Sequence, residues 1–307
     1  GFKVSTNGSI DDFYIVDSAF DHLTYGWYFA KHGNWGPGGS NATNITVEAT
    51  SFSYNDAKGL YVEKLSDTSF SNVTVVENGR NTAFWNNDWN AGFDINLKGE
   101  ENYQNISVTG STFNGNAYDV KEGAALEIKA RDDGSTYGAH PATLSNVTIT
   151  GNTVTNNERG IRLGEPGRDN AGPTNVVVTN NIISGNTQTY VGTDGSFYGG
   201  LINMSLAPVD GSKNWWGDAS GPSGEGSGSG DAVSTNVSYC PWLSTDDLNN
   251  PSYAGDCLGY VQGRTFIDQA DNGLLLSADG DHPSGMTDGF TVRLYDENWN
   301  VLGEQTT

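Results

Sequence analysis

The sequence has 307 residues and is strongly acidic, because 37 Asp and Glu residues against 15 Lys and Arg residues give a formal net charge of −22. Such a chain repels phosphate groups, so nucleic acid and anionic membrane surfaces are poor partners. No stretch reaches the run of about 18 apolar residues that spans a bilayer, so we expect no membrane insertion in this segment. The acidity fits an extracellular, secreted or cell-surface protein, and the 41 glycines are typical of a turn-rich β protein.

Two short strand patterns recur along the chain. Both alternate apolar and polar residues, which indicates a strand with one buried face. The first pattern occurs at residues 12–15, 44–47, 72–75, 105–108, 146–149 and 175–178. The second occurs at residues 26–29, 59–62, 92–95, 125–128, 160–163 and 200–203, and it returns after 33, 33, 33, 35 and 40 residues. This period predicts a solenoid of stacked units, since one unit is too small to bury its own apolar face.

The stacking predicts what lines the interior. Chain direction is the same in every unit, so the sheets should be parallel, with neighbouring strands about 4.8 Å apart. We expect one continuous interior stripe made of Trp27, Leu60, Phe93, Leu126 and Ile161. Asn residues that stand eleven positions after the opening of the first pattern should stack at one bend, because Asn tolerates the left-handed conformation. These are Asn55, Asn116, Asn157 and Asn186.

With this repeat, residues 10–245 resemble the right-handed parallel β-helix superfamily, which is also called pectin-lyase-like. The resemblance implies an all-β chain whose residues 1–245 form a right-handed parallel β-helix of about six or seven rungs. It is specific for the fold and not for one activity, because this scaffold also hosts proteins without catalysis.

Loops interrupt the repeat, and loops on a stacked scaffold tend to gather on one side and carry binding function. Three of them contain side chains suited to ligand binding: Trp35 in residues 30–40, Trp85 and Trp89 in residues 79–91, and Arg131 in residues 129–143.

Residues 214–243 close the repeat and resemble a terminal segment of many bacterial β-helix proteins. Trp215, Trp216 and Trp242 are expected to cap the open end of the core, since an uncapped last rung exposes apolar side chains and unpaired backbone groups. Near this end, Cys240 and Cys257 could form a disulfide in an oxidising compartment, and two unpaired thiols are the alternative.

After a linker at residues 246–258, residues 259–307 no longer follow the period. They resemble the opening of a collagen-adhesin B-type repeat through residues 263–268 and 289–296. The resemblance implies a partial or short immunoglobulin-like β-sandwich in a modular, surface-attached or secreted parent. No cofactor motif is found. Calcium is the one candidate ion, with a polar turn as the alternative, at Asp268, Asp271, Asp279 and Asp281.

The outward-facing residues of the second pattern hold the candidate chemistry, because residues that flank the buried ones point to the opposite face. We expect Asp94 and Glu127 to lie about 5 Å apart on adjacent rungs. The full expectation is an exposed ladder of Tyr28, Tyr61, Asp94, Glu127 and Arg162, with Glu63, Asn96 and Lys129 in a second column beside it.

Three interpretations of this ladder stay open at the sequence level. Asp94 and Glu127 could perform acid/base or nucleophilic work on a sugar, or a carboxylate with Lys129 or Arg162 could serve a lyase that neutralises a uronate. The ladder could instead be a row of ion pairs that only solvates the sheet. The candidates for substrate binding are Tyr28, Tyr61, Trp35, Trp85, Trp89, Asn96 and Arg131.

The sequence thus favours an extracellular modular surface protein whose β-helix is a rigid rod that binds glycans or has a structural role. A polysaccharide lyase or glycoside hydrolase is the first alternative. A structural subunit of an extracellular filament or sheath, formed by self-assembly, is the second, and the cap argues against end-to-end growth.

Overall fold

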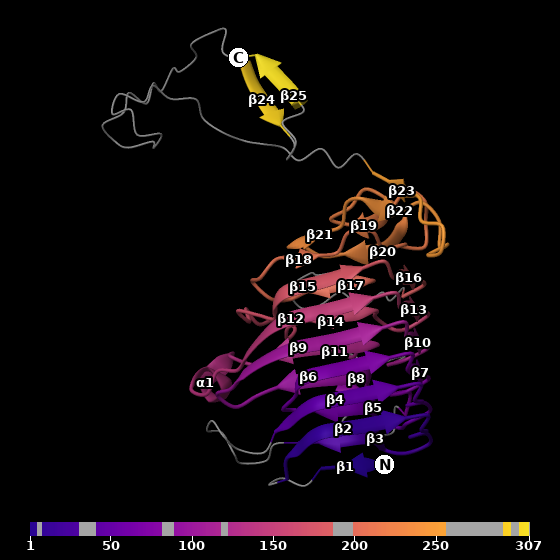
Figure 1. Cartoon of the computed structure of the whole chain (residues 1–307), viewed down its shortest axis with the longest axis vertical. Helices are drawn as coiled ribbons and strands as arrows, with labels where there is room; N and C mark the ends of the chain where they lie inside the picture. The colour runs from indigo at the N-terminus through magenta and orange to yellow at the C-terminus, as the bar shows by residue number, and fades with distance from the viewer. Residues whose placement is uncertain are drawn as a thin grey trace, which may run out of the picture. The chain divides into compact units, whose positions relative to one another are not determined.

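Figure 1 shows the fold of the whole chain in a computed structural model. The structure describes residues 1–4, 8–30, 41–81, 89–117, 122–186 and 199–255, together with the backbone of two strands at 291–295 and 301–306. The described part is all-β apart from one short helix, α1 (Gly134–Gly138). Contacts divide the chain into two compact units, Gly1–Cys257 and Leu258–Thr307.

The first unit contains a long parallel sheet, sheet A, which is formed by the second strand pattern. Each strand pairs with the strand one repeat away, as the constant period predicts. Its strands, in spatial order, are β1 (Phe2–Lys3), β3 (Tyr25–Phe29), β5 (Lys58–Val62), β8 (Ala91–Leu97), β11 (Leu126–Ala130), β14 (Ile161–Leu163), β17 (Leu201–Asn203), β20 (Gly230–Val233) and β19 (Pro222–Gly224).

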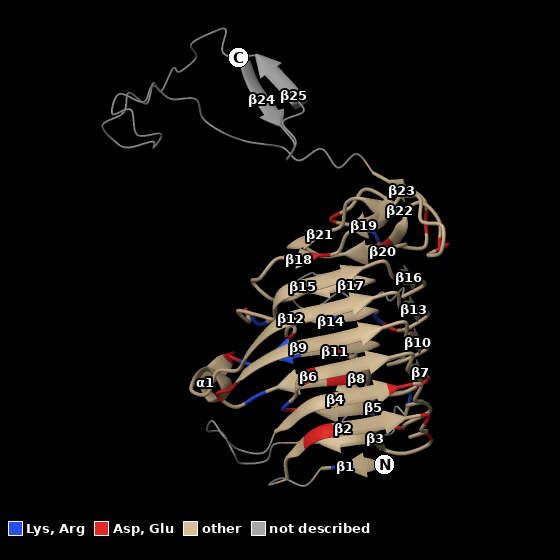
Figure 2. Ribbon diagram, viewed as in Figure 1, with Lys and Arg blue, Asp and Glu red and all other residues tan. Residues whose placement is uncertain are grey.

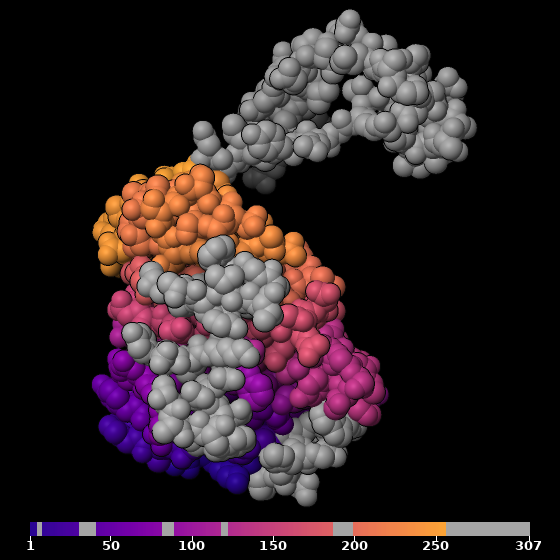
Figure 3. Space-filling model, turned by 180° about the vertical axis from the view of Figure 1, so that it is seen from behind, coloured from indigo at the N-terminus to yellow at the C-terminus, as the bar shows by residue number. Residues whose placement is uncertain are grey.

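Two further parallel sheets complete the unit. Sheet B consists of β2 (Ile10–Val16), β4 (Ala42–Glu48), β6 (Ser66–Ser71), β9 (Asn102–Thr109), β12 (Thr143–Thr150), β15 (Thr174–Thr179), β18 (Val209–Asp210) and β21 (Val237–Ser238). Sheet C consists of β7 (Thr74–Val76), β10 (Thr112–Asn114), β13 (Thr153–Thr155) and β16 (Ile182–Ser184). From β6 to β18 the chain visits sheets B, C and A in turn and then returns to B. Its colours therefore follow one another along the unit (Figure 3). This arrangement is compatible with a β-helix or another solenoid.

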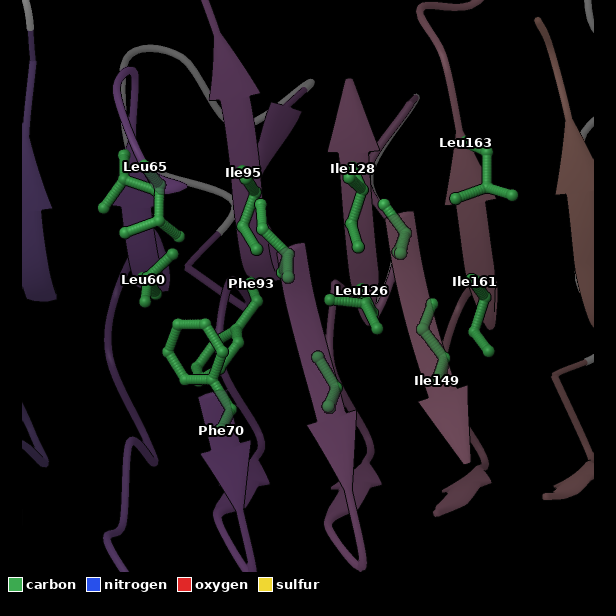
Figure 4. Close-up of a cluster of buried hydrophobic side chains, with 14 of the residues drawn as sticks. Leu60, Leu65, Phe70, Phe93, Ile95, Leu126, Ile128, Ile149, Ile161 and Leu163 are labelled. Atoms are coloured by element: carbon green, nitrogen blue, oxygen red, sulfur yellow. The ribbon is translucent and has the colours of Figure 1, made fainter. Parts of the chain in front are cut away.

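The predicted interior stripe is confirmed. Trp27 pairs with Leu60, Leu60 with Phe93, Phe93 with Leu126 and Leu126 with Ile161, all across parallel strands. All five side chains are fully buried, and their members on β8, β11 and β14 point to the same interior (Figure 4). Each rung therefore removes the apolar face of its neighbour from water, which is the main source of stability in a stacked fold.

One predicted strand is wrong. Sheet B takes its third strand from β6, with Ile45 opposite Thr68, whereas residues 74–76 form β7 in sheet C. The reason is that two different positions of a turn hold a residue in the left-handed conformation. Asp67 (φ 48°) lies inside β6 near its start, and Asn72 (φ 52°) lies at the corner between β6 and β7. An Asn before an alternating pattern therefore does not identify which of the two positions it holds.

The buried Asn ladder is confirmed and extends further than predicted. Along this ladder the side-chain amide of each Asn donates to the carbonyl of the next, at 2.8 to 2.9 Å, in the order Asn55, Asn78, Asn116, Asn157 and Asn186. Asn186 then donates to Asp231 at 2.8 Å. Asn78 stands eleven positions after Asp67 and was missed because the third strand had been placed at 72–75. Stacked amides satisfy one another where the bend leaves backbone groups unpaired.

At the C-terminal end of this unit, Trp216 is fully buried in the core, and Trp242 packs against the core. Trp215 forms an isolated parallel β-bridge with Ile182. Trp242 belongs to β22 (Trp242–Leu243), which pairs antiparallel with β23 (Tyr253–Ala254). Cys257 lies outside the described residues, so its pairing with Cys240 stays a prediction.

In the second unit, β24 (Thr291–Tyr295) pairs antiparallel with β25 (Val301–Thr306). The four aspartates considered for calcium (Asp268, Asp271, Asp279 and Asp281) lie outside the described residues. Within the part of the chain that is described, no helix is long and apolar enough to cross a bilayer.

Candidate functional site

The candidate site lies on the outer face of sheet A, where the register brings the predicted ladder together. Asp94 stands opposite Tyr61 on one side and Glu127 on the other, and Arg162 stands opposite Glu127. In the second column, Lys129 pairs with Asn96. The predicted neighbours are therefore neighbours in the structure, because the strands pair without a shift along these positions.

The ladder opens into a cavity of about 450 Å³. Residues from outside the strands contribute to its walls, including Trp89 before β8, Glu122 before β11 and Tyr137 of α1. The lining residues are Tyr25, Tyr28, Lys58, Tyr61, Trp89, Asn90, Asp94, Asn96, Lys98, Glu122, Lys129, Arg131, Tyr137, Arg162 and Glu165. A walled cavity is what distinguishes a site from a flat solvated face.

The prediction that the ladder is exposed is wrong at its centre. Asp94 and Glu127 each keep 1% of their surface accessible, Arg162 keeps 2% and Lys129 keeps 4%. Glu127 accepts a hydrogen bond from the backbone N–H of Ala124, in the segment before β11, at 2.8 Å. The charged row is therefore buried rather than a solvated surface, and its members Asp94, Lys129 and Arg162 form the floor of the cavity.

Ion pairs connect the floor from rung to rung. The ammonium of Lys129 lies 3.2 Å from Asp94, 3.0 Å from Glu127 and 3.2 Å from Glu165. Arg162 Nη2 lies 2.6 Å from Glu127 Oε2. Lys58 forms an ion pair with Asp94 on its other side. Figure 2 shows acidic and basic residues intermixed among the stacked strands, in keeping with these pairs. Buried charges persist only when they are compensated in this way.

A second group of charges supports one wall. Arg131 holds the carboxylate of Asp133 with two nitrogens, at 2.6 and 2.9 Å, and its guanidinium lies 4.1 Å from the ring centre of Tyr137. Lys98 donates to Glu63 at 2.5 Å and to the hydroxyl of Tyr61 at 3.0 Å. The two-point contact between the Arg131 guanidinium and the Asp133 carboxylate fixes the orientation of this wall.

The ion pairs shift the pKa values of the floor residues. Burial alone would raise the pKa of Asp94, but the charges of Lys129 and Lys58 outweigh burial and hold that pKa well below its ordinary value. The pKa of Glu165 is lowered for the same reason, by Lys129 and Arg131 against burial. Burial would lower the pKa of Lys129, but its three carboxylate neighbours raise it. These groups therefore stay charged across the physiological range.

Aromatic side chains also line the cavity. The rings of Tyr25 and Tyr28 lie 5.0 Å apart, and those of Tyr28 and Tyr61 lie 5.7 Å apart and are stacked. At the rim, Trp89 is 49% exposed and its indole N–H donates to Glu122 at 2.9 Å. The exposed Trp89 ring and the three partly buried tyrosine rings offer flat apolar faces next to polar groups.

Two amide groups of the cavity lining have unused hydrogen-bonding atoms. Asn90 and Asn96 are buried, and neither Asn90 Nδ2 nor Asn96 Oδ1 has a hydrogen-bond partner among the described residues. Buried polar atoms without a partner are rare in folded proteins, and here both residues line the cavity.

The sequence identified part of this site. Tyr28, Tyr61, Trp89, Asn96 and Arg131 do line the cavity together with three of the four candidate catalytic residues, Asp94, Lys129 and Arg162. Glu127 is buried beside them and is not among the lining residues. Trp35 and Trp85 lie outside the described residues. Lys58 was missed because the predicted strand began at Gly59, although Lys58 already belongs to β5. Glu122, Tyr137 and Glu165 lie outside the repeated pattern and give no periodic signal.

A metal centre is not formed in the described part of the chain, where no three His, Cys, Asp or Glu side chains lie close enough to hold an ion. Comparisons of the chain with protein-family models, with curated proteins and with solved structures find no match. The functional argument therefore depends on the geometry of the cavity itself.

Proposed function

We propose that the cavity on sheet A is a glycan-binding site. The observation that carries this proposal is the combination of five aromatic side chains with fixed charged and amide groups around one cavity of about 450 Å³. Aromatic faces suit the apolar faces of sugar rings, and polar groups that cannot move suit their hydroxyls. A cavity of this volume is in the range of small-ligand sites and fits a short stretch of a sugar chain.

The pKa shifts of Asp94, Glu165, Lys129 and Tyr61 favour binding over a role of these four groups as general acid or base. A general acid or base needs a pKa near the working pH. Asp94 and Glu165 stay ionised because their pKa values are lowered, and Lys129 stays protonated because its pKa is raised. Burial likewise raises the pKa of Tyr61, so this hydroxyl also keeps its proton. Cleavage by a lyase or a glycoside hydrolase remains the alternative, and the same experiment tests it.

The setting that we propose for this site is an extracellular, modular surface protein. Its scaffold would be a right-handed parallel β-helix of the pectin-lyase-like type with about six or seven rungs. Residues 259–307 would form a partial B-type-like sandwich. The parallel stacking of sheets A, B and C supports the first part of this proposal. A rigid rod of this kind would present the cavity sideways to a glycan surface, and self-assembly into a sheath stays the alternative.

The proposal is tested with a panel of neutral and acidic polysaccharides, with binding measured by biolayer interferometry on the full chain. We expect binding to at least one glycan and a loss of about tenfold or more for Trp89→Ala, since one stacked aromatic is worth about 1 to 3 kcal/mol. The control is Tyr14→Ala, because Tyr14 is an exposed aromatic on sheet B, away from the cavity. Absence of binding across the panel would refute the proposal. New reducing ends or unsaturated products would instead establish the enzymatic alternative.

A further inference from the structure

Each cation that lines the cavity already has a carboxylate partner. Lys58 pairs with Asp94, and Lys129 pairs with three carboxylates. The remaining pairs are Lys98 with Glu63 at 2.5 Å, Arg131 with Asp133 at 2.6 Å and Arg162 with Glu127 at 2.6 Å. A ligand with a carboxylate or sulfate group would therefore have to displace an internal partner before it could pair with a cation.

The charge balance of the site does not favour an anion either. Five cations line the cavity, and the carboxylates that line it or pair with those cations are Asp94, Glu122, Glu165, Glu63, Glu127 and Asp133. Five cations against six carboxylates leave no positive excess. The chain around the site has a formal charge of −22, so its field repels anions at longer range as well.

The unused hydrogen-bonding atoms of the lining suit hydroxyls. Arg162 Nε and Nη1 have no hydrogen-bond partner among the described residues and can each donate to a hydroxyl oxygen, while the charge of Arg162 is balanced by Glu127. Asn96 Oδ1 needs a hydrogen-bond donor and Asn90 Nδ2 needs an acceptor, and neither finds one among the described residues. A sugar hydroxyl can do both, whereas a carboxylate can only accept. The carboxylate of Glu122 receives the indole N–H of Trp89 and keeps further acceptor capacity at the rim.

We infer that the ligand of this cavity is an uncharged, polyhydroxylated glycan rather than an acidic polysaccharide. This inference depends on the proposed function, because it specifies which class of glycan the same site takes. The ion pairs of the floor serve as a fixed set of acceptors and donors that are already neutralised. The selectivity against acidic chains follows from the absence of an uncompensated cation among the described lining residues.

The first test uses the unmodified full chain and varies ionic strength. Binding of neutral polysaccharides (glucans, mannans, galactans and xylans) and acidic ones (polygalacturonate, alginate and hyaluronan) is measured from about 0.1 M to about 1 M NaCl. Methyl-esterified polygalacturonate is included as the uncharged counterpart of polygalacturonate on the same backbone. We expect a neutral glycan to bind with an affinity that changes less than about twofold over this range, since salt screens only charged pairs.

The second test creates the missing uncompensated cation. Glu63→Gln removes the carboxylate that neutralises Lys98, at the edge of the cavity, and keeps the size of the side chain. We expect this variant to gain affinity for acidic glycans by about tenfold, with a strong salt dependence. Glu48→Gln is the matched control, because it removes one negative charge from an exposed position on sheet B. Circular dichroism and thermal melting establish that each variant is folded.

The outcomes separate the two proposals. An acidic glycan that binds the unmodified chain, and loses affinity as salt rises, would overturn this inference and leave the glycan-binding function in place. Binding to methyl-esterified but not to free polygalacturonate, or to any neutral glycan without salt dependence, supports it. Failure of every glycan to bind would overturn the proposed function and this inference with it.

Discussion

At the scale of single residues, the candidate site consists largely of charges that are buried but compensated. Asp94 lies between two ammonium groups, and Glu127 lies between Lys129 and Arg162. Removing water from such groups is costly unless opposite charges replace it. Each buried charge therefore requires its oppositely charged partner. A row of this kind is rigid, and rigid polar groups bind a ligand without losing further conformational entropy.

Asp94 makes the stability of the fold depend on pH. Its pKa is lowered in the folded state, so the unfolded chain binds a proton more readily than the folded one. The stabilisation is complete above the ordinary pKa of Asp, near 3.9, and is lost as the pH falls through that value toward the folded pKa. We expect urea unfolding to show a loss of about 2 kcal/mol from this group between neutral and strongly acidic pH.

The comparison for this prediction is Asp94→Asn, which removes the titrating group and keeps its shape. This variant should be less stable than the natural chain at neutral pH, because Lys58 loses its carboxylate partner, but its stability should fall less on acidification. Equal pH profiles for the two proteins would show that Asp94 does not contribute to acid sensitivity.

At the scale of elements, the parallel strands are held together at their bends by side-chain ladders as well as by the backbone. Asn116 donates its amide to Asn157, accepts from Asn78 and also donates to the backbone carbonyl of Val75. Its side chain is completely buried. The ladder therefore couples β7, β10 and β13 at one corner, where the turn would otherwise leave polar atoms unpaired.

Asn116→Ala should destabilise the fold by about 2 to 3 kcal/mol, since it leaves buried partners on both neighbouring rungs unsatisfied. The control is Asn114→Ala, which lies two residues away at the partly exposed end of β10 and loses one hydrogen bond, to Thr155. We expect less than about 1 kcal/mol for this control. Chemical denaturation measures both values, and similar losses in the two variants would contradict a special role for the buried ladder.

At the scale of the whole molecule, the net charge of −22 opposes compactness while the core and the buried ion pairs favour it. Most of the acidic surface lies outside the cavity, where salt can screen it. The ion pairs of the floor are shielded by burial and respond much less to salt. Added salt should therefore change the contribution of the exposed charges to stability and leave the contribution of the buried ion pairs nearly unchanged.

We expect the melting temperature to rise as NaCl increases from about 0.1 M to about 1 M, because screening reduces the self-repulsion of the acidic surface. Differential scanning calorimetry measures the change, and sucrose at matched osmolality serves as the uncharged control. A melting temperature that falls over this range would show that exposed ion pairs, rather than repulsion, dominate the salt response.

The sequence by itself determined the parallel stacking, the interior stripe and most of the Asn ladder. Residue types that return at a nearly constant spacing can bury their apolar faces only against the next copy of themselves, so the period sets the register. Neighbours across rungs, such as Asp94 and Glu127, follow directly from that register. The same logic failed at residues 72–75, because Asn in the left-handed conformation occurs both inside the strands of sheet B and at the corner after β6, and the pattern cannot distinguish the two positions.

Only the tertiary structure decided that the charged row is a buried floor and that a cavity stands above it. Asp94 and Lys129 are buried, and the cavity next to them is completed by Trp89, Glu122, Tyr137 and Glu165, which belong to segments without a period. The repeat period predicts the spatial neighbours only of residues that belong to the repeat. For a residue outside the repeat, the sequence does not show which rung it lies next to. The exposure of an outward-facing side chain is set by the segments that fold over it, and these meet the ladder only when the chain is folded.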